Sequence, residues 1–220
     1  MIAKELVSDG IIPLKTSDTG RMALSWMEDL RLLHLPIVNA ETFLGVVSEI
    51  DIFSHNNFDE PVGNMELSLS AAYVLSTDHL FDVLRLMHEQ QLSLVPVVDE
   101  DHKYLGSITM QKLLGALTEA YSFSEPGSII VIEMSANDFV LSTLARIFED
   151  NDTKIISLFL RTDNESTRLE VNLKTNRIET GPLLQALNRF NYQVLGVYSS
   201  NPDADDLKER FEAFMKYMNI

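Results

Sequence analysis

The sequence repeats itself: residues 13–53 read PLKTSDTGRMALSWMEDLRLLHLPIVNAETFLGVVSEIDIF, and residues 73–114 read YVLSTDHLFDVLRLMHEQQLSLVPVVDEDHKYLGSITMQKLL. Matched positions lie sixty residues apart, as Pro36 and Pro96 do, and the offset slips by one residue only in a turn, where insertions are tolerated. Two copies of one unit predict a pseudo-twofold domain. The groove between the copies is then the first place to look for a functional site.

Each copy has the pattern of a helix, two strands and a second helix. An aspartate, Asp18 or Asp78, precedes apolar residues at helical spacing and is expected to cap that helix. Two short apolar runs joined by a polar turn then predict a β-hairpin. These runs are residues 35–38 and 44–47 in the first copy, and 95–98 and 105–108 in the second. One unit is too small to be stable alone, so we expect the two sheets to pack together.

The pattern changes after residues 122–128, SFSEPGS, whose Ser, Pro and Gly content marks a domain boundary. Strand and helix patterns then follow in the order βαββαβ, the ferredoxin-like split arrangement, up to residue 199. Residues 203–220 predict a final helix, which docks back onto the chain or joins a second subunit. Its apolar stripe consists of Leu207, Phe211, Phe214 and Met218.

Composition excludes several classes of protein. The 220-residue chain has 33 acidic and 17 basic residues, and its formal net charge of −16 works against binding an extended phosphate backbone. It contains no cysteine, which removes disulfides, thiolate metal sites and thiol nucleophiles. The sequence has neither an apolar run long enough to span a bilayer nor a signal-peptide pattern, so we expect a cytoplasmic protein without membrane partners. Because of its net negative charge, we expect no nucleic-acid partner either.

Two motifs carry a family resemblance. The segment LPIV at residues 35–38 is followed by GVVSEIDI at 45–52, and PVVD at 96–99 is followed by GSIT at 106–109. In this duplicated order the chain resembles tandem CBS domains, also called a Bateman module. With its βαββαβ segment, it is similar to CBS proteins of the acetoin-utilisation regulator type, in which an ACT-type domain follows the pair.

The resemblance implies an α+β fold with four parts. They are CBS repeat 1 at residues 1–60 and CBS repeat 2 at 61–121, both βαββα units, then a ferredoxin-like ACT-type domain at 128–199 and a C-terminal helix at 203–220. The resemblance implies a sensor that binds an adenine nucleotide or a related adenosyl compound in the cleft between the repeats. ACT ligand loops usually carry a glycine between the first strand and helix, whereas residues 135–139 read SANDF here.

The family's site motif, a Ser or Thr followed three residues later by Asp, occurs once, as Ser48 and Asp51. At a helix start, a hydroxyl and exposed N–H groups can hold a phosphate while a carboxylate one turn along accepts ribose hydroxyls. Without the resemblance, a solvated or helix-capping aspartate explains Asp51 about as well.

The pseudo-symmetry of the family implies that the partner repeat supplies the other wall of this cleft. That wall consists of Ala72, Ser93 and Leu94, with Val46 beside the motif. Leu94 and Val46 would flank a base, and Ser93 would bond a phosphate or ribose. Ordinary core or rim packing is the alternative for each of these residues.

The second cleft departs from the family pattern. Thr109 keeps the hydroxyl, but Lys112 stands where the ribose-binding aspartate is expected, and lysine cannot accept a hydrogen bond. His34 of the partner repeat would face the same cleft, so Lys112 and His34 could receive a phosphate or another anion. The alternative is an empty or structural cleft with a solvated lysine.

No catalytic or metal-binding motif is recognisable, since the five histidines lack metal-ligand spacing and no P-loop, GxSxG or GxGxxG occurs. We therefore expect a regulatory sensor and homodimer rather than an enzyme. It would require no cofactor, would bind AMP, ADP, ATP or S-adenosylmethionine as a regulatory ligand, and would relay binding through the ACT-like domain. The competing hypothesis is a module for dimerisation or partner docking that has no physiological nucleotide.

Overall fold

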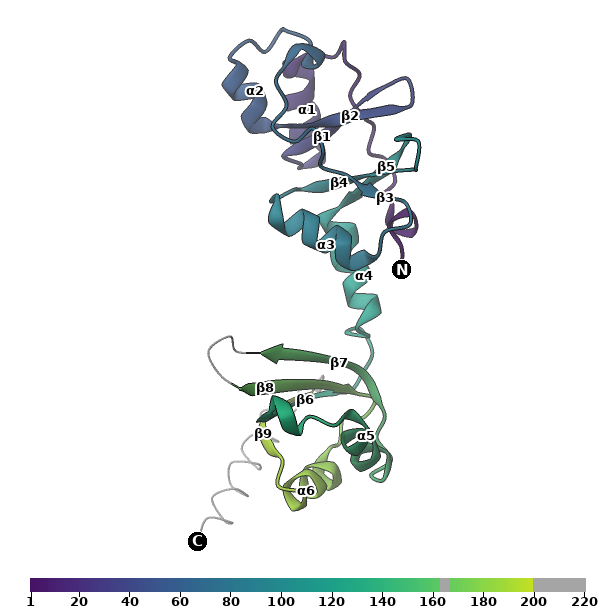
Figure 1. The fold of residues 1–220 in the computed structure, drawn as a ribbon, viewed down its shortest axis with the longest axis vertical. Coiled ribbons are helices and arrows are strands. Elements are labelled where there is room, and N and C mark those ends of the chain that lie inside the picture. Colours follow the sequence, from purple (N-terminus) through teal and green to yellow (C-terminus); the bar gives the residue numbers. More distant parts are fainter. Residues whose placement is uncertain (163–166, 200–220) are drawn as a thin grey trace. The chain divides into compact units, whose positions relative to one another are not determined.

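The computed structural model describes residues 1–162 and 167–199. The predicted C-terminal helix at 203–220 lies outside these described residues. The chain divides into two compact units, Met1–Leu117 and Thr118–Ile220 (Figure 1). The boundary between the units thus falls shortly before the predicted break at 122–128.

The first unit contains the predicted pattern twice. Its first copy consists of α1 (Gly20–Leu30), β1 (His34–Asn39), β2 (Thr42–Ser48) and α2 (Glu49–His55). Its second copy consists of β3 (Val74–Leu75), α3 (Leu80–Glu89), β4 (Leu94–Val98), β5 (Tyr104–Thr109) and α4 (Met110–Ala120). Two short 3-10 helices, η1 (Ala3–Leu6) and η2 (Val62–Asn64), lie in the segments that precede the copies. The predicted succession of helix, hairpin and helix is confirmed in both copies.

Each hairpin is antiparallel and has a parallel segment beside it. β1 pairs with β2, β4 pairs with β5, and β3 lies parallel to β4. In the first copy, Leu14 takes the place of β3 and forms a parallel bridge to Ile37. Both hairpins shift register at the same point, between Ile37 and Val38 and between Val97 and Val98. The duplication therefore extends to the irregularities of the sheets.

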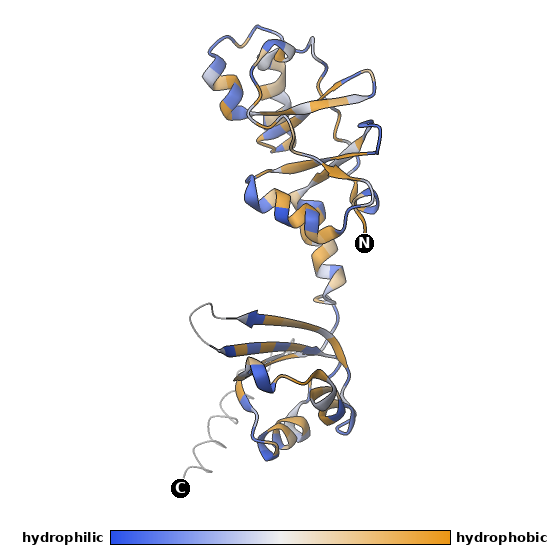
Figure 2. Cartoon of the chain, in the orientation of Figure 1, coloured by the Kyte–Doolittle hydropathy of each residue, from blue (hydrophilic) through white to orange (hydrophobic). Residues whose placement is uncertain are grey.

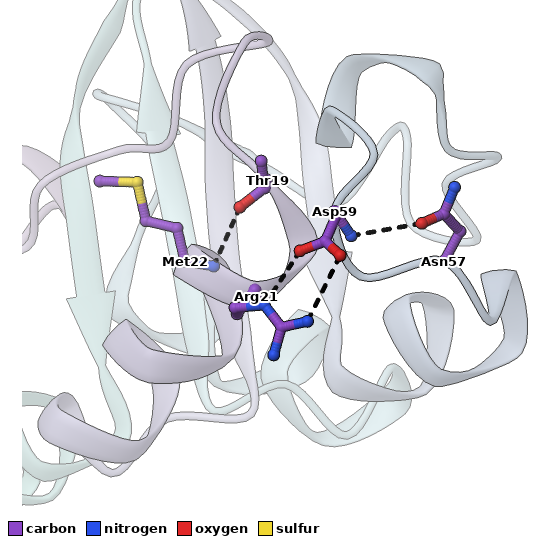
Figure 3. A network of polar contacts seen from close by, with 5 residues as sticks. All are labelled: Thr19, Arg21, Met22, Asn57 and Asp59. Carbon is purple, nitrogen blue, oxygen red and sulfur yellow. Dashed lines mark hydrogen bonds and ion pairs between the residues drawn. The ribbon is translucent and has the colours of Figure 1, made fainter.

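The helix caps lie one residue later than the sequence predicted. The Oγ1 of Thr19 caps α1 by accepting the N–H of Met22 at 3.3 Å (Figure 3). His79 occupies the equivalent position before α3. The carboxylates of Asp18 and Asp78 instead accept the N–H three residues back, at 2.7 and 2.8 Å. The two aspartates close the turns that lead into the helices, so the prediction that they cap them was wrong.

The two copies exchange the segments that precede them. The N–H of Ser8 donates to the carbonyl of Ser107 at 2.8 Å, so the N-terminal segment lies against the second copy. Conversely, the N–H of Val46 donates to the carbonyl of Leu69 at 3.2 Å, so the segment before the second copy lies against the first. We call these two stretches, residues 3–8 and 67–72, the entry segments.

Matched glycines admit the entry segments. A Cβ added to Gly106 would lie 2.4 Å from Cγ1 of Val7, and one added to Gly45 would lie 2.9 Å from Cδ1 of Leu67. Real Cβ atoms do not approach other atoms this closely without displacement. The glycine in each second strand is therefore explained by the close passage of a neighbouring chain segment.

Each copy completes the hydrophobic core of the other. One buried cluster is built mainly from the second copy but includes Leu6 and Val46. The other is built mainly from the first copy but includes Leu94. Neither copy has a complete core of its own, as expected for units of this size.

The described residues of the second unit form a four-stranded antiparallel sheet with two α-helices. Its elements are β6 (Ser128–Ser135), α5 (Leu141–Glu149), β7 (Ile155–Thr162), β8 (Arg168–Thr175), α6 (Gly181–Arg189) and β9 (Gln193–Ser199), with η3 (Ala136–Asp138) before α5. The strand order is β7-β8-β6-β9, and every neighbouring pair is antiparallel. The predicted βαββαβ, ferredoxin-like arrangement is confirmed.

The core of this unit lies between the sheet and its two helices, which cover one face (Figure 1). Along β8, the buried residues Leu169, Val171 and Leu173 alternate with polar ones (Figure 2). This period of two is what a sheet with one covered face requires.

Candidate functional site

The predicted pair Ser48 and Asp51 meets at the start of α2. Ser48 ends β2 and caps the helix, and its Oγ accepts the N–H of Asp51 at 3.0 Å. Oδ2 of Asp51 accepts the N–H of Ser48 at 2.9 Å. The two residues thus form a reciprocal capping box, which satisfies two backbone donors at the helix terminus. The spacing that suggested a ligand motif is therefore also a structural one.

The capping box uses only part of the hydrogen-bonding capacity of the two side chains. Among the described residues, Oδ1 of Asp51 receives no hydrogen bond, and the hydroxyl proton of Ser48 has no acceptor. Asp51 is half-buried, whereas Ser48 is buried. One carboxylate oxygen and one hydroxyl donor therefore remain for a ligand at the edge of the helix.

A hydrogen-bonded seam joins the two copies next to this pair. Oγ of Ser93 accepts the N–H of Leu33 at 3.0 Å and lies 3.0 Å from Nδ1 of His34. The N–H of Ser93 also donates to Nδ1 of His34, at 3.2 Å. Ser93 is thereby held to the first copy by three contacts, through both its side chain and its backbone.

The contacts of His34 determine which ring nitrogen carries its proton. Because Nδ1 accepts from the backbone N–H of Ser93, the proton of the neutral ring is on Nε2. Burial lowers the pKa of His34 below its ordinary value of 6.5, and the charge of Asp51 acts in the opposite direction. The neutral imidazole is therefore favoured.

Sequence reasoning assigned His34 and Ser93 to different clefts, but the structure brings them into direct contact. His34 also lies opposite Ser48 in the β1–β2 ladder, and its pKa responds to Asp51. The Ser93–His34 contact thus lies next to the capping box in the ladder, although no hydrogen bond among the described residues joins the two pairs. The sequence signal for this contact was the repeat itself, because positions 34 and 93 lie 59 residues apart, near the offset of sixty.

The apolar residues predicted to flank a base lie in the core. Val46 and Leu94 are fully buried, and Ala72 is 1% exposed. Val46 and Ala72 belong to one core cluster, whereas Leu94 belongs to the other. These three side chains therefore offer almost no exposed apolar surface to a base.

Thr109 of the second predicted cleft bonds to the N-terminal entry segment. Oγ of Ser8 lies 3.1 Å from Oγ1 of Thr109 and accepts the N–H of Thr109 at 3.1 Å. Oγ1 of Thr109 also accepts the N–H of Lys112 at 3.3 Å, while the Lys112 side chain is exposed. No described contact joins Lys112 to His34. Sequence reasoning missed Ser8, although it repeats at Ser68 in the same register.

Two other kinds of site were tested on the residues that the structure describes. Across residues 1–162 and 167–199, no group of three or more His, Asp and Glu side chains is placed to hold a metal ion. Within the same ranges, no helix combines the length and apolar character needed to cross a bilayer.

Comparison with known proteins matches the second copy to a family. Residues 67–119 match the CBS domain. The chain is also similar to the solved structure of a CBS domain pair/ACT domain protein from Thermotoga maritima, at 29% sequence identity and a TM-score of 0.50. That likeness covers 55% of this chain and 98% of the Thermotoga chain.

Two further solved structures are similar at lower identity. CBSX2, solved in complex with AMP, is 24% identical over 54% of this chain and 96% of its own, with a TM-score of 0.46. A Vibrio cholerae structure described as an acetoin utilization protein (AcuB) is 24% identical over 57% of this chain and 98% of its own, with a TM-score of 0.47.

Proposed function

We propose that this chain is a regulatory sensor of the CBS-domain type whose ligand, an adenosine-containing compound, binds beside Ser48 and Asp51. The observation that supports the proposal is that the capping box leaves Oδ1 of Asp51 and the hydroxyl proton of Ser48 without partners among the described residues. A fixed carboxylate oxygen next to a hydroxyl donor suits the two hydroxyls of a ribose and a neighbouring polar group. The capping box holds both side chains in place before the ligand arrives.

The seam between the copies gives this site a means of signalling. Ser93 and His34 lie next to the capping box and belong to different copies. A ligand that contacts this group alters the hydrogen bonds that hold the copies together. If the ligand binds one relative arrangement of the two copies more tightly than another, it shifts the protein toward that arrangement.

The buried position of Val46 and Ala72 makes binding depend on movement of an entry segment. A single hydrogen bond, from the N–H of Val46 to the carbonyl of Leu69 at 3.2 Å, holds that segment to β2 in the ladder. Release of this hydrogen bond would admit the base of the ligand between Val46 and Ala72. We propose that this displacement is the event passed on to the ferredoxin-like unit.

The proposal is tested by calorimetric titration of the full chain with AMP, ADP, ATP and S-adenosylmethionine. We expect saturable binding of at least one of them. Asp51→Asn keeps an oxygen for the capping box but removes the charge, so the dissociation constant should rise by at least about tenfold. Hydrogen bonds to a charged group contribute about 1.5–3 kcal/mol, and 1.4 kcal/mol corresponds to a factor of ten.

Asp82→Asn is the matched control. Asp82 occupies the same position in the capping box of α3, where its Oδ2 accepts the N–H of His79 at 3.2 Å. This variant should bind like the unmodified chain. The proposal fails if none of the four compounds binds at millimolar concentration, which would favour the dimerisation or docking module instead. It also fails if Asp51→Asn and Asp82→Asn bind equally well.

A further inference from the structure

The second unit contains a buried lysine, Lys174. It lies on β8 and is only 5% exposed. Among the described residues, its ammonium takes part in no ion pair and no hydrogen bond. Lysine normally keeps its ammonium in water, or pairs it with an acidic group where the residue is buried. The burial of Lys174 therefore points to an anion that the described residues do not supply.

Lys174 lies on the face of the sheet opposite α5 and α6. Along β8, Val171 and Leu173 belong to the core with the two helices, so the alternation of a strand places Lys174 on the other side. We call this other side the open face. In the two ladders of β8, Lys174 lies between Ser157 of β7 and Ile129 of β6, which are both half-buried.

Aromatic rings gather on the β7 side of Lys174. The rings of Tyr121 and Phe159 make an edge contact with their centroids 6.3 Å apart, and Phe123 stacks on Tyr121 at 5.6 Å. Oγ of Ser157 donates to the carbonyl of Tyr121 at 3.0 Å. Because Ser157 is the ladder partner of Lys174, this bond holds the aromatic group beside the lysine.

A further ring lies on the β9 side. Tyr198 is the ladder partner of Ile129, which is itself the ladder partner of Lys174 on β8. Tyr198 is 64% exposed, Phe123 is 48% exposed and Phe159 is 38% exposed. Exposed apolar surface that is gathered in one place marks an interaction site. The buried ammonium thus lies on a face with accessible aromatic surface on both sides of it.

Two ion pairs occupy the other end of the open face. Arg161 pairs with Glu170 at 3.4 Å, and Arg168 pairs with Glu133 at 3.0 Å. Glu170 lies four residues from Lys174 along β8, which corresponds to about 13 Å in a strand. These two carboxylates are engaged with arginines, so they do not neutralise Lys174.

We propose that the open face binds a small organic anion, whose carboxylate pairs with Lys174 and whose planar, apolar body stacks on the neighbouring rings. One ammonium matches one negative charge, and the formal net charge of −16 disfavours anions of higher charge. Aromatic side chains favour a planar partner that meets their faces or edges. The ligand class is therefore an aromatic monocarboxylate. This site belongs to the second unit and does not depend on nucleotide binding beside Ser48 and Asp51.

Benzoate is the probe, added to the full chain and followed through the amide signals of Ile129 and Ser157 in two-dimensional NMR spectra. We expect saturable shifts of both signals at millimolar benzoate. Benzamide has nearly the same shape without the charge, so its dissociation constant should be at least about tenfold higher.

Lys174→Met removes the ammonium and keeps an unbranched apolar stem, so it should raise the dissociation constant for benzoate by at least about tenfold. Without benzoate, the same variant should unfold at a higher urea concentration, because it removes a buried charge that has no partner. Lys154→Met is the matched control, since Lys154 is exposed in the same unit. It should bind benzoate like the unmodified chain.

The proposal is overturned if benzoate causes no saturable shift at millimolar concentration, or if benzamide binds as tightly as benzoate. It is also overturned if Lys174→Met and Lys154→Met bind benzoate equally well. A lower urea midpoint for Lys174→Met would overturn it too, because the ammonium would then already have a stabilising partner.

Discussion

Removing the Ser93 hydroxyl tests the seam between the two copies. In Ser93→Ala, the N–H of Leu33 loses its acceptor at 3.0 Å and Nδ1 of His34 loses one of its two contacts with Ser93. The Leu33–Ser93 hydrogen bond is exposed, so its loss should cost about 0.5–1.5 kcal/mol, the net contribution of a typical hydrogen bond. The Ser93 N–H still donates to His34. We therefore expect the free energy of unfolding of the first unit to decrease by an amount within this range, not by more.

The assay is urea unfolding followed by the fluorescence of Trp26. Trp26 is the single tryptophan and packs against the core of the first copy, so its signal reports on the first unit. Ser68→Ala is the control, because Ser68 is exposed and its removal should change stability by less than about 0.5 kcal/mol.

A double-mutant cycle separates the seam from general packing. His34→Leu introduces the residue type found at the matched position, Leu94. If Ser93 and His34 act as a pair, the double variant should lose less stability than the sum of the single losses, by about 0.5 kcal/mol or more. A Ser93→Ala loss no greater than that of Ser68→Ala, or strictly additive losses, would refute the reasoning.

Four further expectations follow from particular contacts. Burial lowers the pKa of His34 below 6.5. The contribution of the neutral His34 ring to the free energy of unfolding is therefore complete above about pH 6.5. That contribution declines as the pH falls from 6.5 through the pKa of His34 in the folded protein. In His34→Leu, the free energy of unfolding should depend less on pH in this range. An unchanged pH dependence would contradict the assignment to His34. Gly106→Ala should destabilise the first unit by about 1–3 kcal/mol, and adding Val7→Ala should recover part of the loss; no recovery would show that the 2.4 Å approach is not the cause. Ser48→Ala should cost about 1 kcal/mol in urea unfolding through loss of the cap, and a loss within error would argue against the capping box. In the second unit, Thr175→Val should cost about 1–3 kcal/mol by near-ultraviolet circular dichroism, because the buried hydroxyl has two carbonyl acceptors, Arg177 at 3.0 Å and Ser128 at 3.2 Å; a neutral effect would mean that the hydrogen bond of this hydroxyl contributes little.

The order of elements could be predicted because helix and strand periodicities are local properties of the chain. The duplication strengthened each assignment, since two copies had to agree. The caps could not be predicted to the residue, because Asp18 and Thr19 are both good capping residues and only the backbone turn decides between them.

The candidate site was predicted in part. The spacing of Ser48 and Asp51 correctly placed both residues at a helix start, but a capping box and a ligand motif share that spacing. The contact between Ser93 and His34 joins residues of different copies, and local patterns do not carry such information. For Val46, Ala72 and Leu94 the sequence left both a ligand contact and core packing open, and their burial follows from the exchange of core residues between copies.

The exchanged entry segments make the first unit resemble a covalently joined dimer. A fragment ending near residue 60 would keep residues 3–8 without the strand they contact, and it would lack the stretch at 67–72 that its own sheet receives. Two such fragments would each hold what the other is missing. A chain cut between the copies should therefore yield complementary halves that reassociate, and a gene encoding a single copy would already encode a reciprocal homodimer from which duplication could produce the present chain.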